Sequence, residues 1–392
     1  MKRINQLFGI SLITLGLSAC GGGGSSSSND EPESRDVSGL SECDTINSTQ
    51  AVVCGTALAS DGVTPLINAE VTLLDDGAKP SGASARGVED PDVCLTDVAG
   101  DYVCLLPEGV NGAVSLLISL PGFVDATVDT TVSPGSVTEA GSQPLESDNS
   151  NKWVVVPGAF DGVQVLLSQL KDCTLSDGSG NPFNYATGSP ESARGSADCE
   201  NKGLLVLDDE INSAEEASAF FSSNDLFNYD SLFINCSADY GNVSGVNTVV
   251  QDFVDDGGHV YFSDLSSSWL SSAFPGKVNF AGNATSTGTI EADVTTAGLQ
   301  SVVGSTMEVE FDLSVWSAID TVASDVTTFV EGDITSLSST YSGIHPITVG
   351  WRENSNSGCV FYSSYHIEGA SQDSEQERAM KYLVQNIGSV CQ

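Results

Sequence analysis

The chain has 392 residues, 40% of them hydrophobic, so it is long enough for two or three domains with at least one sizeable core. It carries 13 basic residues against 53 acidic ones, a net charge of −40. Nucleic acid is therefore not expected as a partner, because no basic surface is available to neutralise phosphates. A saline habitat and weak cation binding would each account for this charge, and composition does not choose between them.

The N-terminus has the features of an export signal. Lys2-Arg3 precedes an apolar run at 7–17, which is too short to span a bilayer. The run ends in Leu17-Ser18-Ala19-Cys20, which resembles the lipobox of bacterial lipoproteins. The resemblance implies that residues 1–19 are a signal peptide and that Cys20 is lipidated. A plain signal peptide cut near Ala19 is the alternative.

Residues 20–42 are rich in Gly, Ser and acidic residues, a composition typical of a flexible tether. Gly21 after the cysteine is similar to the residue choice that sorts lipoproteins to the outer membrane. No other apolar run approaches the length of a membrane span, so we expect anchoring by lipid alone. The expected location is the cell outer membrane, on its periplasmic face or at the cell surface.

The ten cysteines fit an exported protein. With Cys20 assigned to lipid, nine remain, and in an oxidising compartment disulfides are expected rather than metal thiolates. None has a C-x-x-C spacing, and the odd number requires one free or intermolecular thiol. Apart from Cys236, the disulfide candidates are Cys43, Cys54, Cys94, Cys104, Cys173, Cys199, Cys359 and Cys391.

Residues 43–136 are predicted to be all-β, because short Val-, Leu- and Thr-rich runs alternate with turn residues. The segments VCGTALASDGVTPLINAEVTLL, LTDVAGDYVCLL and LLISLPGFVDATVDTTV resemble the carboxypeptidase regulatory-like domain, a small transthyretin-like β-sandwich. This resemblance implies a non-enzymatic module that serves stability or surface binding.

A tight hairpin turn is predicted at 96–101, with Gly100 supplying a positive φ. Cys94 and Cys104 flank this turn, which favours a disulfide across the hairpin, and Cys43–Cys54 is the other expected pair. Asp97 and Asp101 would serve turn chemistry or Ca²⁺. Turn chemistry is favoured, since calcium prefers six or more oxygen ligands.

Residues 137–151 are predicted to be a polar linker, and residues 152–392 an α/β domain. Strands alternate with helices, which indicates a parallel sheet covered on both faces. The expected strands are 152–160, 203–210, 229–236 and 259–265, and the expected helices are 161–170 (N-cap Asp161), 213–223 (N-cap Ser213), 245–258 and 372–387. Two stretches depart from the alternation, an insertion at 171–202 closed by Cys173–Cys199 and antiparallel β excursions at 277–343.

This α/β region resembles the class I glutamine amidotransferase-like superfamily, which includes ThuA-like proteins. The resemblance lies in Tyr229-Asp230, the segments FVDDGG and HVYFSD, the closing GCVFYSSYHIEG and the last helix. It implies a C-terminal flavodoxin-like three-layer α/β domain with antiparallel β insertions. Together with the N-terminal all-β sandwich, this predicts a multidomain chain. It also implies a catalytic His-x-Glu at the end of the closing strand, here His366 as base and Glu368 as its orienting group.

The nucleophile departs from the family pattern. The family places it in a G-x-C-x-G turn, where this chain has FSDLSSSW, with Ser263 and Asp264 at that place. Ser263 is one candidate nucleophile, and Asp264 is expected as a strand-end polar residue or cap. Cys236, one strand earlier, is a candidate nucleophile, a disulfide partner of Cys359 or Cys391, or a buried free thiol.

No metal or cofactor is expected. His259, His345 and His366 lack the spacing of zinc ligands. A carbohydrate platform built from tryptophans is less favoured than core packing; the residues concerned are Trp153, Trp269, Trp316 and Trp351.

Two functions remain open. The favoured one is a non-catalytic binding or structural module of the cell envelope, with an envelope protein or a glycan as partner. The alternative is an envelope hydrolase of peptide or glycan bonds, using His366 and Glu368 with Cys236 or Ser263 as nucleophile.

Overall fold

The computed structural model of the chain describes residues 43, 49–74, 93–158, 160–185, 188–189, 192–207, 219–236, 245–338, 340–367, 374–388 and 390–391. The expected signal peptide at 1–19, the tether at 20–42 with its Cys20, and Glu368 lie outside these residues. Across the described ranges, no helix combines the length and apolar character needed to cross a membrane.

The N-terminal domain is built from two β-sheets, with strand orders β4-β1-β7 and β3-β2-β5-β6. Residues of both sheets, such as Val53, Val71 and Ile118, are buried in one apolar core, as expected for two sheets packed face to face. The strands are β1 (Val52–Ala59), β2 (Glu70–Leu74), β3 (Val93–Leu95), β4 (Asp101–Leu105), β5 (Gly112–Ser119), β6 (Ala126–Val132) and β7 (Val137–Leu145).

Strand β7 corrects the predicted domain boundary. The segment 137–151 was expected to be a linker, but residues 137–145 pair in parallel with β1. β7 is an edge strand whose side chains are mostly exposed or half-buried. Such a strand does not need an apolar pattern, so its polar sequence resembles that of a linker.

Four disulfides form in the described part of the chain: Cys43–Cys54, Cys94–Cys104, Cys173–Cys199 and Cys359–Cys391. The two expected sandwich pairs and the pair that closes the insertion are present. Cys236 is a buried free thiol, so its expected alternative as a disulfide partner of Cys359 or Cys391 is wrong. In the hairpin turn, one Asp97 carboxylate oxygen accepts hydrogen bonds from the backbone N–H groups of Ala99 and Asp101, which is ordinary turn chemistry.

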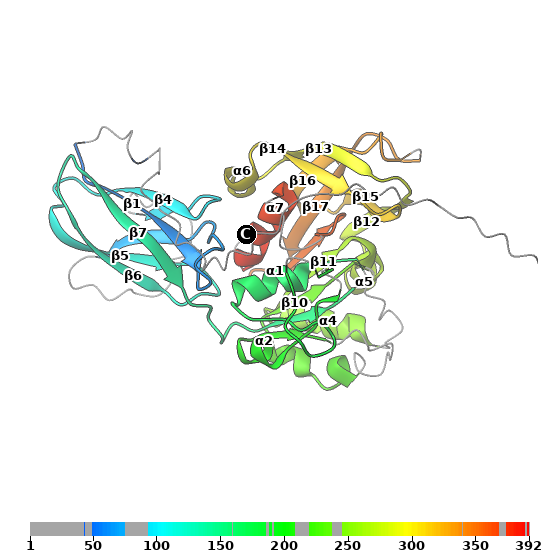
Figure 1. Cartoon of the computed structure of the whole chain (residues 1–392). Coiled ribbons are helices and arrows are strands. Elements are labelled where there is room, and N and C mark those ends of the chain that lie inside the picture. The colour runs from blue at the N-terminus through cyan, green and yellow to red at the C-terminus, as the bar shows by residue number, and fades with distance from the viewer. Residues whose placement is uncertain are drawn as a thin grey trace, which may run out of the picture. The chain divides into compact units, whose positions relative to one another are not determined.

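The C-terminal domain is organised around a nine-stranded sheet (Figure 1). Five of its strands are parallel: β8 (Trp153–Val156), β9 (Leu204–Val206), β10 (Ser231–Ile234), β11 (His259–Ser263) and β18 (Cys359–Ser363). Their spatial order is β9-β8-β10-β11-β18, which is 2-1-3-4-5 counted along the chain. In doubly wound sheets of this order, ligands bind beyond the carboxyl ends of the strands, where the direction of chain winding reverses. Here that point lies between β8 and β10.

Antiparallel strands extend the sheet beyond β18. They follow in the order β17 (Ile344–Arg352), β16 (Thr327–Asp333), β13 (Gly288–Val294) and β14 (Thr306–Phe311), while β12 (Val278–Ala284) and β15 (Trp316–Val322) form a separate two-stranded ribbon. The β excursions expected within 277–343 are therefore present. They also bring Asp312, directly after β14, to within 3.2 Å of His366, which follows β18.

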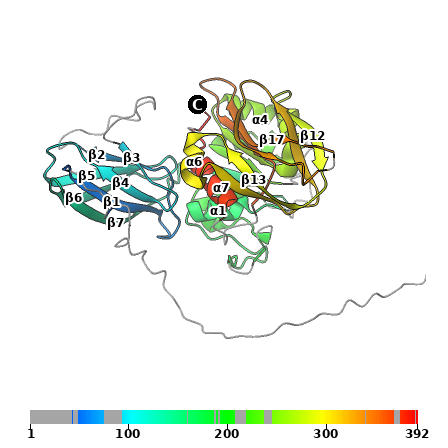
Figure 2. The same ribbon diagram turned by 90° about the horizontal axis from the view of Figure 1, so that it is seen from above.

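Helices cover both faces of the parallel strands (Figure 2). Phe233 and Tyr261 share a core cluster with α1 (Val163–Leu170) and α7 (Glu375–Gln385), whereas Leu232 and Phe262 share another with α4 (Val246–Asp255) and α5 (Ser267–Ala273). Because successive strand residues point to opposite faces, this alternation produces three layers. All four tryptophans are buried in these clusters, which favours their role in the core.

Two helix predictions need adjustment. Helix α1 begins after Gly162, and Asp161 does not cap it; its carboxylate is buried and accepts hydrogen bonds from other segments instead. Within the expected helix at 213–223, residues 219–222 are helical and 213–218 lie outside the described residues. The domain also contains the short helices α2 (Ala197–Asn201) and α6 (Ala297–Val303).

Because partial burial favours the uncharged form of His259, we expect the free energy of unfolding to decrease measurably in acid. Its Nδ1 accepts a hydrogen bond of 2.9 Å from the Cys359 backbone N–H. Burial, together with the charge of Arg352, lowers the pKa of His259 to about 4. An unfolded histidine has a pKa of about 6.5, so between these values the unfolded chain binds the extra proton. The free energy of unfolding should therefore decrease as the pH falls through this range, by up to about 1.4 kcal/mol per pH unit from this group.

The variant His259→Asn keeps an acceptor but does not titrate. Chemical denaturation at a series of pH values should show a shallower acid loss for this variant than for the parent chain. His345→Gln is the matched control and should leave the slope unchanged. Equal slopes for the parent and His259→Asn would contradict the prediction.

Candidate functional site

Polar side chains that follow three of the parallel strands lie close together at the carboxyl ends of these strands. Cys236 lies two residues after β10, Asp264 directly after β11, and His366 three residues after β18. Ile234 pairs with Phe262 in the sheet, so Cys236 and Asp264 stand at the same level on neighbouring strands. Phe262 pairs with Tyr362, and His366 follows at even spacing on the same face. Strand register therefore brings the three chain segments to the same edge of the sheet, and the turn at Asp264 and the loop after β18 set the side chains.

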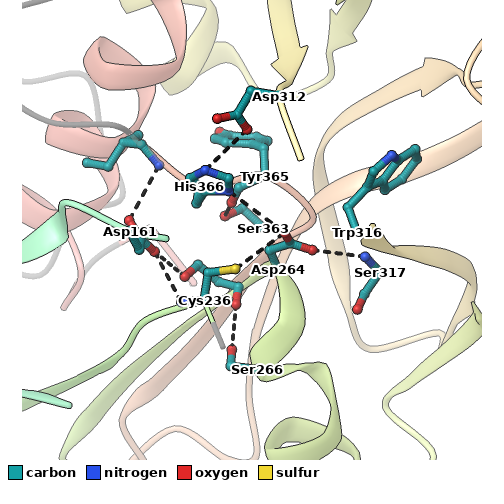
Figure 3. Close-up of polar contacts among 12 residues, drawn as sticks. Asp161, Cys236, Asp264, Ser266, Asp312, Trp316, Ser317, Ser363, Tyr365 and His366 are labelled. Atoms are coloured by element: carbon teal, nitrogen blue, oxygen red, sulfur yellow. Dashed lines mark hydrogen bonds and ion pairs between the residues drawn. The ribbon is translucent and has the colours of Figure 1, made fainter. Parts of the chain in front are cut away.

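The polar atoms of these three residues lie within 4.8 Å of one another, and all three residues are buried. Figure 3 shows them around the Asp264 carboxylate. The Cys236 thiol donates to Asp264 Oδ2 over 3.4 Å, and His366 Nδ1 lies 3.8 Å from the same oxygen. One carboxylate oxygen thus faces both a thiol and an imidazole.

Asp264 is held rigidly in an uncommon backbone conformation. Its φ is +40°, a left-handed value that Asp tolerates better than most residues. Its Oδ1 accepts a 2.9 Å hydrogen bond from the Ser317 N–H, and its backbone carbonyl accepts one of 2.9 Å from the Tyr362 hydroxyl. The sharp strand-to-helix turn is therefore present where the family resemblance places the nucleophile, but it presents a carboxylate.

His366 is fixed between two carboxylates. Its Nε2 lies 3.2 Å from Asp312 Oδ1, on the far side of the ring from Asp264. Burial alone would lower the pKa of His366, but the ion pairs with Asp264 and Asp312 and the proximity of Cys236 and Asp161 raise it to about 12. The imidazole is therefore protonated at neutral pH in the arrangement described.

Cys236 is fully buried at the end of β10. Burial raises the pKa of its thiol to about 11, and the neighbouring carboxylates of Asp264 and Asp161 add to this, while a hydrogen bond with His366 acts in the opposite direction. A thiol with this pKa is neutral at pH 7. It is therefore a poor nucleophile in this state, because the thiolate is the reactive form.

Ser263 belongs to a different set of contacts. Its hydroxyl donates to Asp161 Oδ2 on the opposite side of the sheet from α5. Asp161 also accepts from the backbone N–H groups of Cys236 and Ile367, each over 3.4 Å. Burial raises the pKa of Asp161, against the influence of His366 and these donors. Asp161 thus ties together the loops that carry Cys236 and His366.

Gly158, two residues after β8, permits the close approach of its own loop to the backbone at Cys236. A Cβ at this position would lie 1.8 Å from the carbonyl oxygen of Cys236, a distance that no side chain can accommodate without moving the backbone. The glycine is needed here because there is no space for a side chain. Its φ is not positive, so its backbone conformation is not the reason.

The sequence-predicted residues therefore separate into two groups. Cys236 and His366 come within 4.8 Å of each other, and the Asp264 carboxylate faces both. Ser263 contacts Asp161, and Glu368 lies outside the described residues. His259 and His345 belong to other contacts, with Cys359 and Ile319.

Asp161 and Asp312 were not anticipated as site residues. The signal for Asp161 was its place in the loop between the first parallel strand and α1, at the winding reversal. No local signal marks Asp312.

Comparison with known proteins adds distant likenesses of fold. No family model and no curated protein matches the chain. A solved structure of a protein described as ThuA-like from Bacteroides uniformis is similar with a TM-score of 0.36 and 14% identity, covering 48% of this chain and 78% of that one. A protein described as one of the subunits of GMP synthase, from Thermoplasma acidophilum, has a TM-score of 0.34 and 10% identity, covering 60% and 93%. PurLQS from Thermotoga maritima has a TM-score of 0.33 and 12% identity, covering 61% and 97%.

Proposed function

We propose that the chain is a lipid-anchored protein of the bacterial cell envelope whose α/β domain is a binding module without thiol catalysis. Cys20 in its lipobox-like context supports the anchor, and the Gly/Ser-rich segment after it supports a tether. Gly21 supports sorting to the outer membrane. The β-sandwich would serve as a spacer, and an envelope protein or a glycan would be the partner.

One observation carries the non-catalytic part of the proposal. The turn after β11, where an amidotransferase-like fold would hold its nucleophile, carries Asp264. Its carboxylate is already engaged by the Ser317 N–H, the Cys236 thiol and His366. An imidazole that holds its proton between two carboxylates has no free nitrogen with which to act as a general base.

Chemical modification of Cys236 tests this proposal. A pKa of about 11 in place of 9.0 lowers the thiolate fraction at neutral pH about a hundredfold, and complete burial slows the reagent further. We expect iodoacetamide to leave Cys236 unmodified in the native chain and to alkylate it in urea without reductant. Peptide mass spectrometry would measure both. Rapid native alkylation that slows in His366→Ala would contradict the proposal.

A second candidate function is supported by the approach of Cys236 to His366. Their polar atoms lie within 4.8 Å, a separation that a small shift would convert into a thiol–imidazole pair. In that case the chain would hydrolyse peptide or glycan bonds with Cys236 as nucleophile. Turnover of glutamine, peptides or glycans that disappears in both Cys236→Ser and His366→Ala would establish this function and overturn the first.

A further inference from the structure

The three residues at the strand ends are all metal ligands. A cysteine sulfur, a carboxylate oxygen and an imidazole nitrogen are the donor types that zinc prefers, and a thiolate with an imidazole disfavours magnesium and calcium. Among the described residues, Cys236, Asp264 and His366 form a group of this kind, with their donor atoms within 4.8 Å of one another. The group mixes three ligand chemistries, which distinguishes it from a simple cluster of acids.

Two of the donor–donor distances are close to those around a tetrahedral ion. Bond lengths of about 2.3 Å to sulfur and about 2.0 Å to oxygen and nitrogen place tetrahedral ligand atoms roughly 3.3–3.6 Å apart. Cys236 Sγ lies 3.4 Å from Asp264 Oδ2, and His366 Nδ1 lies 3.8 Å from the same oxygen. The sulfur–oxygen pair already has the required separation, and the nitrogen lies a few tenths of an ångström too far from the oxygen. The sulfur and the nitrogen lie within 4.8 Å of each other, so binding would draw these two donors together around the ion.

The surroundings hold each donor in place. Asp312 receives the far nitrogen of His366 at 3.2 Å, an arrangement that fixes ring orientation in metal-binding histidines. The Ser317 N–H holds the other oxygen of Asp264, and Asp161 holds the backbone N–H of Cys236. Each donor therefore has a supporting contact from outside the group, as Figure 3 shows.

The geometry points to a site for one zinc ion, bound by Cys236 Sγ, Asp264 Oδ2 and His366 Nδ1, with Asp312 supporting the histidine. Binding would release the thiol proton and the imidazole Nδ1 proton to solvent, so exchange of two protons for one divalent ion leaves the buried charge unchanged. The net charge of −40 on the chain would favour the approach of a cation.

Three protein ligands leave the fourth tetrahedral position for water or for a donor atom of a bound partner. This inference rests on the proposed binding function, because it takes the group formed by Cys236, Asp264 and His366 as the place where a partner is bound. It is tested by metal content, whereas the binding function is tested by thiol reactivity and turnover. Absence of zinc would leave the non-catalytic proposal standing, and Cys236-dependent hydrolysis would overturn that proposal whatever the metal content.

The experiment uses the full-length chain, stripped with a chelator and titrated with zinc chloride against a competing chelator. We expect a stoichiometry of one, measured by plasma mass spectrometry after gel filtration. Cys236→Ser and His366→Gln should each weaken binding by at least about a hundredfold, and Asp312→Asn by about 10- to 100-fold. His345→Gln, which changes a histidine outside the group, is the control and should leave the affinity unchanged.

A second readout does not depend on affinity. Cobalt(II) in place of zinc should produce a thiolate-to-metal charge-transfer absorption in the parent chain that is lost in Cys236→Ser. Circular dichroism in the presence of chelator would establish that each variant is folded. If Cys236→Ser is not folded, Cys236→Ala takes its place. The inference is overturned if the folded parent chain binds no stoichiometric zinc, or if zinc and the cobalt absorption persist in the Cys236 and His366 variants.

Discussion

Replacing Asp264 by alanine is expected to lower the free energy of unfolding of the metal-free chain by about 3–5 kcal/mol. The variant removes the carboxylate that faces His366, Cys236 and the Ser317 N–H in a buried setting. It therefore leaves a protonated imidazole with one partner fewer and a buried N–H without an acceptor. It also places alanine at a φ of +40°, a left-handed backbone conformation that alanine adopts less readily than aspartate. Urea denaturation in the presence of a chelator measures the loss.

The pH of that measurement matters. The pKa of His366 is raised to about 12, above the value of about 6.5 in an unfolded chain. The stabilisation from the ion pair is thus complete below about pH 6.5 and declines as the pH rises toward the folded value. Experiments at about pH 6 should show the full effect of Asp264→Ala, and the difference between the variant and the parent should shrink in alkaline solution.

Asp264→Asn is the matched control for this prediction. Asparagine tolerates a left-handed φ and keeps an acceptor for the Ser317 N–H, so it loses the charge alone. Its destabilisation should be smaller than that of alanine. Combining Asp264→Ala with His366→Gln should cost less than the sum of the single changes, because the stranded charge is gone. Additive losses, or equal losses for alanine and asparagine, would show that the ion pair is not the cause.

The parts of the fold that sequence could predict are those with one buried face. The helix α4 was recognisable because apolar residues repeat on one side, at Val246, Val249, Val250, Phe253 and Val254. All of them except Val249, which is half-buried, are buried in the structure. The strand β7 was not recognisable, because an edge strand with exposed side chains carries no such pattern. Burial of a face leaves a periodic trace in sequence, and backbone pairing alone does not.

The same reasoning explains what could be predicted of the site. Cys236 and His366 follow recognisable parallel strands, so their convergence could be inferred from the place of those strands in the sheet. Asp161 looked like a helix cap, because a polar residue before an apolar helix normally has that role. Asp312 follows β14, an antiparallel strand four places from β18 in the sheet. Its approach to His366 depends on how the added strands fold back, which no local pattern encodes.

Removing the disulfide of the insertion is the second large effect expected. Cys173 and Cys199 are 26 residues apart, so the chain-entropy model gives about 3.5 kcal/mol for the loop that they close. For Cys94 and Cys104, 10 residues apart, the same model gives about 2.7 kcal/mol. We therefore expect Cys173→Ala/Cys199→Ala to lose more stability than Cys94→Ala/Cys104→Ala, as measured by urea denaturation of each double variant.

The contacts of the insertion decide whether this loss is global. The Tyr185 hydroxyl contacts Ser168 of α1 at 3.1 Å and the Cys173 carbonyl at 3.2 Å, and its ring packs edge-on against Phe183. Without the disulfide these contacts would still hold the insertion to α1 in the native state, so the cost falls on the gain in freedom of the unfolded chain. Hydrogen exchange in the double variant should then stay near the parent level around Tyr185, while the midpoint of global unfolding decreases. Selective loss of protection at 174–196 with an unchanged midpoint would show instead that the insertion opens on its own and that the disulfide constrains only this segment.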